Sequence, residues 1–191
     1  MDRIQKVSSY LLIVFNILLI ALPLLAILQW LFMEVKTSDV SSFINFFGLL
    51  ERTMETPEGI VNLSTVHWTP LLKILGFSAD ILKLLPIILS LFVLKSIFRN
   101  YQKGEVFSRA NATLYRRIGG LFVLNALLIK SLSHTLLVLA VTLTNPPGHH
   151  WIQIHFGTPN MTALFCGILV IVISWVMLEA SKLHDDQQLT I

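Results

Sequence analysis

The chain has 191 residues, of which 54% are hydrophobic and only 13% are charged, whereas about a quarter of an ordinary soluble domain is charged. This composition excludes a typical soluble protein and leaves little room for a separate folded domain, so we expect one membrane domain over residues 1–191. The net charge is +3, and Cys166 is the only cysteine, which excludes an intrachain disulfide and a cysteine metal cluster.

Four apolar segments are long enough to cross a bilayer as helices. Residues 7–33 contain no Asp, Glu, Lys, Arg or His, and about 20 such residues span the roughly 30 Å of hydrocarbon. This run is longer than the 7–15 apolar residues typical of a signal peptide, so we expect a retained first helix. The other predicted spans are residues 71–98, 118–143 and 161–178. The sequence therefore predicts an all-α bundle of four transmembrane helices.

The distribution of charge predicts which way the spans point. Basic residues gather around the connection 99–117, and Arg3 and Lys6 lie at the N-terminus. Acidic residues outnumber basic ones in the connection 34–70, and residues 144–160 carry no Asp, Glu, Lys or Arg. Because short cytoplasmic segments carry an excess of Lys and Arg, we expect cytoplasmic termini, a cytoplasmic tail over residues 179–191, and external loops at 34–70 and 144–160.

The first external loop is long for a segment without structure of its own. Apolar residues recur at helical spacing over residues 40–50, which predicts a short amphipathic helix on the membrane surface. Pro57 and Gly59 are expected to end such structure. Three tryptophans near the predicted outer boundaries favour interface anchoring; they are Trp30, Trp68 and Trp151.

Four polar residues fall at membrane depth: Asp80, Lys83, Lys130 and His134. At 1.5 Å per residue, Asp80 lies about 14 Å from an outer start at Leu71, and Lys130 about 18 Å from an inner start at Ile118. An ion pair between Asp80 and Lys130 can therefore form, and an unpaired charge there costs roughly 2.5–3.5 kcal/mol. Three interpretations stay open: a relay or polar substrate site, a structural clamp, or an interfacial Asp80 if the span starts nearer Phe77.

The predicted external face also carries three histidines within seven residues, His149, His150 and His155. Imidazole suits zinc and copper, which makes these residues weak candidates for metal ligands. No carboxylate or thiol accompanies them, and the chain lacks the zinc-protease, Walker and dinucleotide-binding motifs. We therefore predict no enzyme, no resident metal and no cofactor.

The connection between the middle spans contains a Y-x-x-G-x-x-F-S segment made of Tyr101, Gly104, Phe107 and Ser108, followed by Asn111. The chain ends in two aspartates, two glutamines and then Leu189, Thr190 and Ile191. Together these features resemble the bacterial domain of unknown function 2975, short inner-membrane proteins of about four spans, over nearly the whole chain. The resemblance implies a multi-pass protein of the bacterial cytoplasmic membrane. It also implies that a cytoplasmic partner such as a small helix-turn-helix regulator is worth considering.

The same residues have a physical interpretation. Gly104 permits a turn, and Ser108 is a good N-cap for a helix that begins at Arg109. The basic residues here can satisfy the positive-inside rule and bind anionic lipid, or they can contact a protein. The leading hypothesis is a non-catalytic membrane protein that binds or regulates a partner through this segment and the tail, without binding nucleic acid directly. The alternative is a small transporter or channel, as a homo-oligomer or alone, that uses Asp80 and Lys130.

Overall fold

The computed structural model describes residues 3–31, 53–56, 59–145 and 160–188. Several predicted features lie outside these residues: the amphipathic helix at 40–50, Trp151, the three outer histidines (His149, His150 and His155) and the last residues, Leu189, Thr190 and Ile191.

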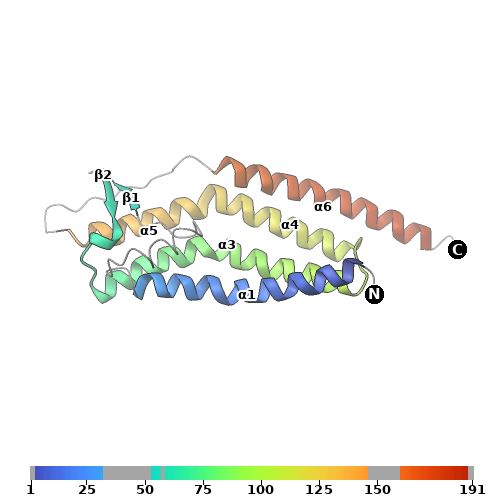
Figure 1. Ribbon diagram of the computed structural model, residues 1–191. Coiled ribbons are helices and arrows are strands. Elements are labelled where there is room, and N and C mark those ends of the chain that lie inside the picture. Colours follow the sequence, from blue (N-terminus) through green and yellow to red (C-terminus); the bar gives the residue numbers. More distant parts are fainter. Residues whose placement is uncertain (1–2, 32–52, 57–58, 146–159, 189–191) are drawn as a thin grey trace. The chain divides into compact units, whose positions relative to one another are not determined.

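Helices form nearly all of the described chain (Figure 1). They are α1 (Arg3–Leu31), α3 (Pro70–Gln102), α4 (Arg109–Leu124), α5 (Lys130–Thr142) and α6 (Met161–Gln188), and a π-helical turn (Asn125–Ile129) joins α4 directly to α5. Four continuous helical stretches are long and apolar enough to cross a membrane. The prediction of four helices long and apolar enough to span a membrane is thus confirmed, and the second helix begins at Pro70 rather than near Phe77.

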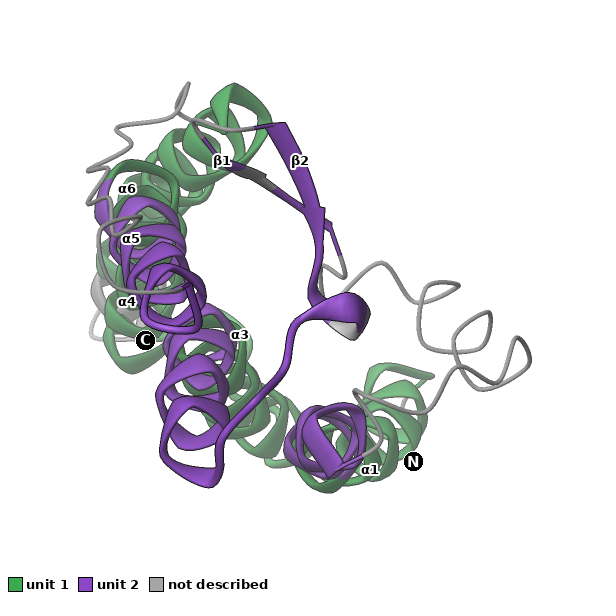
Figure 2. Cartoon of the chain, turned by 90° about the vertical axis from the view of Figure 1, so that its left-hand side faces the viewer, with its two compact units in different colours: residues 1–20, 85–127, 158–191 green, residues 21–84, 128–157 purple. Residues whose placement is uncertain are grey.

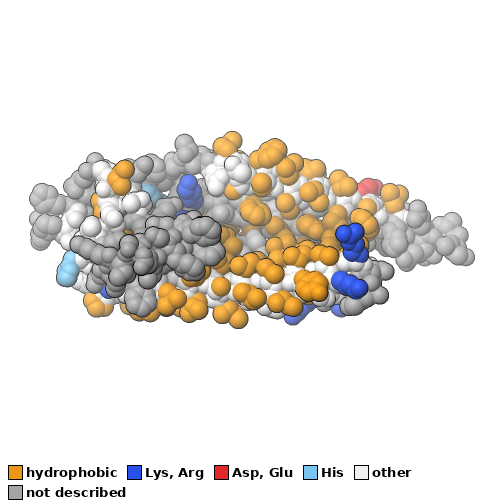
Figure 3. Space-filling model, in the orientation of Figure 1, with side chains coloured by type: hydrophobic (Ala, Val, Ile, Leu, Met, Phe, Trp, Pro, Cys, Tyr) orange, Lys and Arg blue, Asp and Glu red, His pale blue; other side chains and the backbone are white. Residues whose placement is uncertain are grey.

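The apolar side chains of these helices point largely outward. Only 11% of the most apolar window of α1 is buried within the protein, and exposed hydrophobic side chains cover much of the visible surface (Figure 3). Exposing this apolar surface to water would cost roughly 25 cal/mol per Å², whereas contact with lipid hydrocarbon carries no such cost. The structure therefore has the surface of a membrane protein.

The described chain divides into two compact units (Figure 2). Unit 1 comprises residues 1–20, 85–127 and 158–191, and unit 2 comprises residues 21–84 and 128–157. In unit 1, α4 packs along α6. A close approach of two glycines permits this packing, because a Cβ atom on Gly119 would lie 2.7 Å from the carbonyl oxygen of Gly167. Small residues at such contacts are typical of helix pairs in membranes.

Unit 2 contains a short antiparallel hairpin that the sequence interpretation missed. Its strands are β1 (Thr53–Thr56) and β2 (Gly59–Asn62), with Met54 opposite Val61, and a 3-10 turn (Leu63–Thr65) follows. Gly59 has a φ of 121°, which a residue with a side chain rarely adopts. Pro57 and Gly59 were expected only to end a helix; Pro57 lies outside the described residues, and Gly59 is the first residue of β2.

The core of unit 2 brings this hairpin together with the helices. Met54 of β1 and Leu63 of the 3-10 turn are almost fully buried. They join one cluster with Trp68, which precedes α3, and with buried residues of α1, α3 and α5: Trp30, Leu72, Ala79, Leu137, Val138, Ala140 and Val141. The end of the first long connection is thus part of the packed core of this unit.

Candidate functional site

The connection between α3 and α4 is a tight, hydrogen-bonded turn. Gly104 has a φ of 84°, a conformation that glycine adopts without steric cost, and its N–H donates to the carbonyl of Tyr101 at 3.1 Å. Ser108 caps α4, since its Oγ accepts from the backbone N–H of Asn111 at 3.2 Å. The predicted turn and the predicted helix start at Arg109 are both present.

Asn111 holds this connection together from its buried position on α4. Its side chain is fully buried, and its Nδ2 donates to the carbonyl oxygens of Glu105 at 2.6 Å and Val106 at 3.0 Å. Its Oδ1 accepts from Nδ2 of Asn100 at 2.7 Å. One amide side chain therefore satisfies two backbone acceptors of the connection and ties them to the end of α3, which fixes the path of the chain between the two helices.

Further side chains of unit 1 support the end of α3. The hydroxyl groups of Tyr101 and Tyr115 are 2.8 Å apart, and the Tyr101 ring packs edge-on against Phe98 at 5.4 Å. Gln102 donates through Nε2 to Oγ of Ser9 on α1 at 2.8 Å. The sequence interpretation missed Tyr115, although its spacing of four residues from Asn111 places both on one side of α4.

Phe107 differs from the other residues of the motif because it points outward. Its side chain is 58% exposed, while Asn111 is buried and Tyr101 and Ser108 are partly buried. Lys103, Glu105 and Arg109 are exposed around it on the same connection. Tyr101, Gly104, Ser108 and Asn111 thus build the connection, and Phe107 is the apolar side chain that it presents.

The segment after the fourth predicted span is helical, since α6 continues to Gln188. Lys182 and Glu179 form an exposed ion pair of 3.0 Å along it. Ser181 is buried, and its Oγ donates to the carbonyl of Leu178 at 2.8 Å. Most of the predicted tail therefore extends the helix of the span.

Asp80, in unit 2, is buried against a pair of tryptophans. Its Oδ2 accepts from Nε1 of Trp30 at 2.6 Å, and Asp80 is only 4% exposed. The Trp30 ring meets Trp68 edge-on at 5.0 Å, and Nε1 of Trp68 donates to the carbonyl of Leu63 at 2.8 Å. Trp30 and Trp68, which were predicted as interface anchors, are both buried within the protein, and both N–H groups have protein acceptors.

The other polar residues that were predicted to lie at membrane depth are arranged differently. Lys130 is exposed on α5, and no bond joins it to Asp80 in the part of the chain that the structure describes. Lys83 and His134 are partly buried. One link between α3 and α5 comes from Ser133, whose Oγ donates to the carbonyl of Ala79 at 2.9 Å. The indole of Trp30 on α1 and the hydroxyl of Ser133 on α5 thus both bond to adjacent residues of α3, an arrangement that suits a structural clamp.

Gln29, beside Trp30 in the sequence, is a further buried polar residue of unit 2. It is fully buried, and neither Nε2 nor Oε1 has a hydrogen-bond partner among the residues that the structure describes. As for metals, the described residues contain no group of three His, Cys, Asp or Glu side chains that could hold an ion.

Comparison with known proteins places the chain in a family. The family model described as "Protein of unknown function (DUF2975)" matches residues 58–191. The chain belongs to this family. The match includes α3 to α6 and the motif residues Tyr101 to Asn111, but it begins after α1, so it covers less of the chain than the resemblance in the sequence suggested. No curated protein matches the chain, and no solved structure does.

Proposed function

We propose that this member of the family is a non-catalytic protein of the bacterial cytoplasmic membrane, with both termini in the cytoplasm, that binds or regulates a partner there. The binding surface consists of the α3–α4 connection together with the chain end after α6. The observation that carries the proposal is Phe107, an aromatic side chain that is 58% exposed on a connection whose backbone Asn111 holds in place.

This geometry favours binding because the connection is already ordered in the free protein, so its conformational entropy is not lost on association. Association normally loses about 0.5–1.5 kcal/mol for each side chain that becomes immobile, and pre-organised segments reduce that loss. Aromatic and arginine side chains are also enriched in the centres of protein interfaces. Phe107 beside Arg109 supplies both residue types at one place.

The charge around Phe107 supports an acidic partner. Lys103, Arg109 and Arg116 are exposed near the connection, and Glu105 is the exposed acidic residue there. Basic surfaces steer partners of opposite charge toward a site. A small helix-turn-helix regulator with an acidic face fits this chemistry. In that case the regulator would bind nucleic acid, and this chain would bind only the regulator.

The test is purification from native membranes with a tag on the N-terminus, comparing wild type with Phe107→Ala. We expect the yield of a stoichiometric cytoplasmic companion to fall by about tenfold or more, as it does for the central residues of an interface. Removal of Leu189, Thr190 and Ile191 should reduce it as well.

Phe165→Ala is the matched control, because Phe165 on α6 is 62% exposed but lies within an apolar span. It should keep the companion. The proposal is wrong if wild type holds only copies of itself, or if both phenylalanine variants retain the companion equally at normal membrane abundance.

A further inference from the structure

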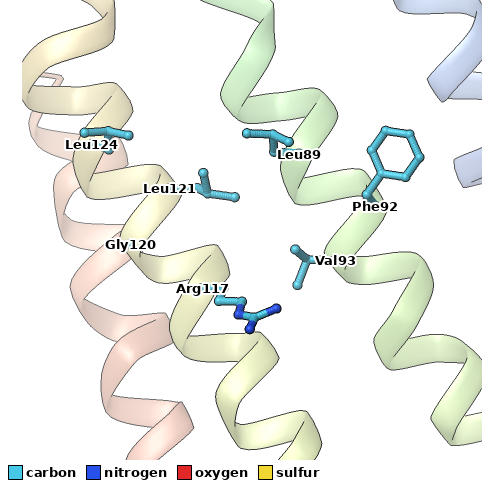
Figure 4. Close-up of a pocket in the computed structure, with 7 residues that line it drawn as sticks. All are labelled: Leu89, Phe92, Val93, Arg117, Gly120, Leu121 and Leu124. Atoms are coloured by element: carbon cyan, nitrogen blue, oxygen red, sulfur yellow. The ribbon is translucent and has the colours of Figure 1, made fainter.

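Unit 1 contains an apolar groove that ends at an arginine. The groove lies between α3 and α4 and has a volume of about 390 Å³, within the range of roughly 300–1,000 Å³ of small-molecule sites. Leu89, Phe92 and Val93 line it from α3, and the residues from α4 are Arg117, Gly120, Leu121 and Leu124 (Figure 4).

The lining of the groove changes from charged to apolar along the helices. On α4 it runs from Arg117 to Leu124, seven residues or about 10 Å at 1.5 Å per residue, and Figure 4 shows Val93 across from Arg117 and Leu89 across from Leu121 and Leu124. Arg117 is thus the charged end, nearest the connection, and the leucines form the far end. The groove continues open above Gly120, because a Cβ atom there would meet no atom within 4 Å.

Arg117 is available to a ligand. Its side chain is exposed, and none of the described residues forms an ion pair or hydrogen bond with it. A guanidinium group presents donors in a fork that matches phosphate oxygens. A molecule that complements this groove therefore has a phosphate at one end and a hydrocarbon chain of about 10 Å or more at the other, estimated from the helical rise.

We propose that the groove binds one anionic phospholipid, with an acyl chain between α3 and α4 and its headgroup phosphate on Arg117. Bulk lipid touches every outward face of these helices, but this face adds a concave apolar surface and a guanidinium group at its end. The site is separate from Phe107, and binding there does not depend on a protein partner.

The experiment uses the full chain in nanodiscs with a phosphatidylglycerol that carries a photoreactive diazirine on one acyl chain, followed by mass spectrometry of the crosslinked peptides. We expect labelling to concentrate on residues 89–93 and 120–124. Arg117→Gln should lower it by about fivefold, which corresponds to the attraction between one basic side chain and an anionic surface. Gly120→Leu should lower it at least as much, because a leucine side chain fills the groove while leucine favours the helix more than glycine does.

Arg116→Gln is the control, since Arg116 is exposed next to Arg117 but does not line the groove; it should keep the wild-type labelling. Phosphatidylcholine with the same diazirine chain should label these residues no more than α1. Inorganic phosphate should not compete, which distinguishes a lipid from a free phosphate. Equal labelling by the two lipids, or unchanged labelling of Gly120→Leu, would overturn the proposal.

Discussion

Gly119→Ala is expected to lower the free energy of unfolding by about 1–3 kcal/mol, the usual cost of an overpacked core. The added methyl group would lie 2.6 Å from Cγ1 of Ile171 and 2.7 Å from the carbonyl oxygen of Gly167. A backbone carbonyl within a helix cannot rotate away, so α4 and α6 must separate along their contact. Unfolding in mixed dodecyl maltoside and SDS micelles, followed by circular dichroism, measures the change.

The neighbouring glycine provides the matched control. Gly120→Ala introduces the same methyl group where no atom lies within 4 Å. It should raise the free energy of unfolding by up to about 1 kcal/mol, because alanine has a higher helix propensity than glycine. The two adjacent substitutions should therefore act in opposite directions. Equal destabilisation by both would mean that helix propensity or detergent contact, rather than the approach of α4 to α6, decides the outcome.

Gly76→Ala should have a comparable or larger effect in unit 2, about 3 kcal/mol when overpacking and the loss of part of a buried hydrogen bond are combined. A Cβ atom on Gly76 would overlap Cη2 of Trp30. The ring has little freedom to move, because its N–H donates to Asp80 at 2.6 Å and it packs edge-on with Trp68. The same detergent titration measures this variant.

A second substitution makes that prediction specific. Trp30→Phe replaces the large indole with a smaller ring that lacks the overlapping atom, so Gly76→Ala should cost at least about 1 kcal/mol less in the Trp30→Phe background, a coupling typical of residues in contact. Ser78→Ala, on an exposed site of the same helix, should change stability by less than about 0.5 kcal/mol. Strict additivity of the two changes would rule out the contact between Gly76 and Trp30.

The helices and the α3–α4 connection could be predicted because their causes are local. A long apolar segment without strong charges favours a helix across hydrocarbon wherever it occurs, and the cap at Ser108 needs only the backbone of the next three residues. The π-helical turn at Asn125–Ile129 has no comparable local cause in the sequence, which predicted one regular helix there. The hairpin of β1 and β2 was missed because each strand has only four residues, too few to show an alternating pattern.

The surroundings of Asp80 show a different limit. Counting residues along the predicted spans left Asp80 either within the membrane or at its interface, and the structure shows that it is buried within the protein. The hydrogen bond from Trp30 could not be deduced in the same way, because charge suggested Lys130 as the partner and the indole N–H lies 50 residues away in the chain. That choice depends on how the helices pack, and Gly76 determines it by leaving room for the ring.

The hydrogen bonds of Asn111 have a consequence for how the α3–α4 connection responds to ionic strength. The groups that it joins are neutral: the Asn100 amide and the carbonyl oxygens of Glu105 and Val106. Salt screens interactions between exposed charges over about 10 Å at 0.1 M, but it has little effect on buried bonds between neutral groups. Dissolved salt can therefore weaken the attraction of a partner by Lys103 and Arg109 while the position of Phe107 stays the same. Ionic strength thus changes how strongly a partner is attracted without changing the surface that it contacts.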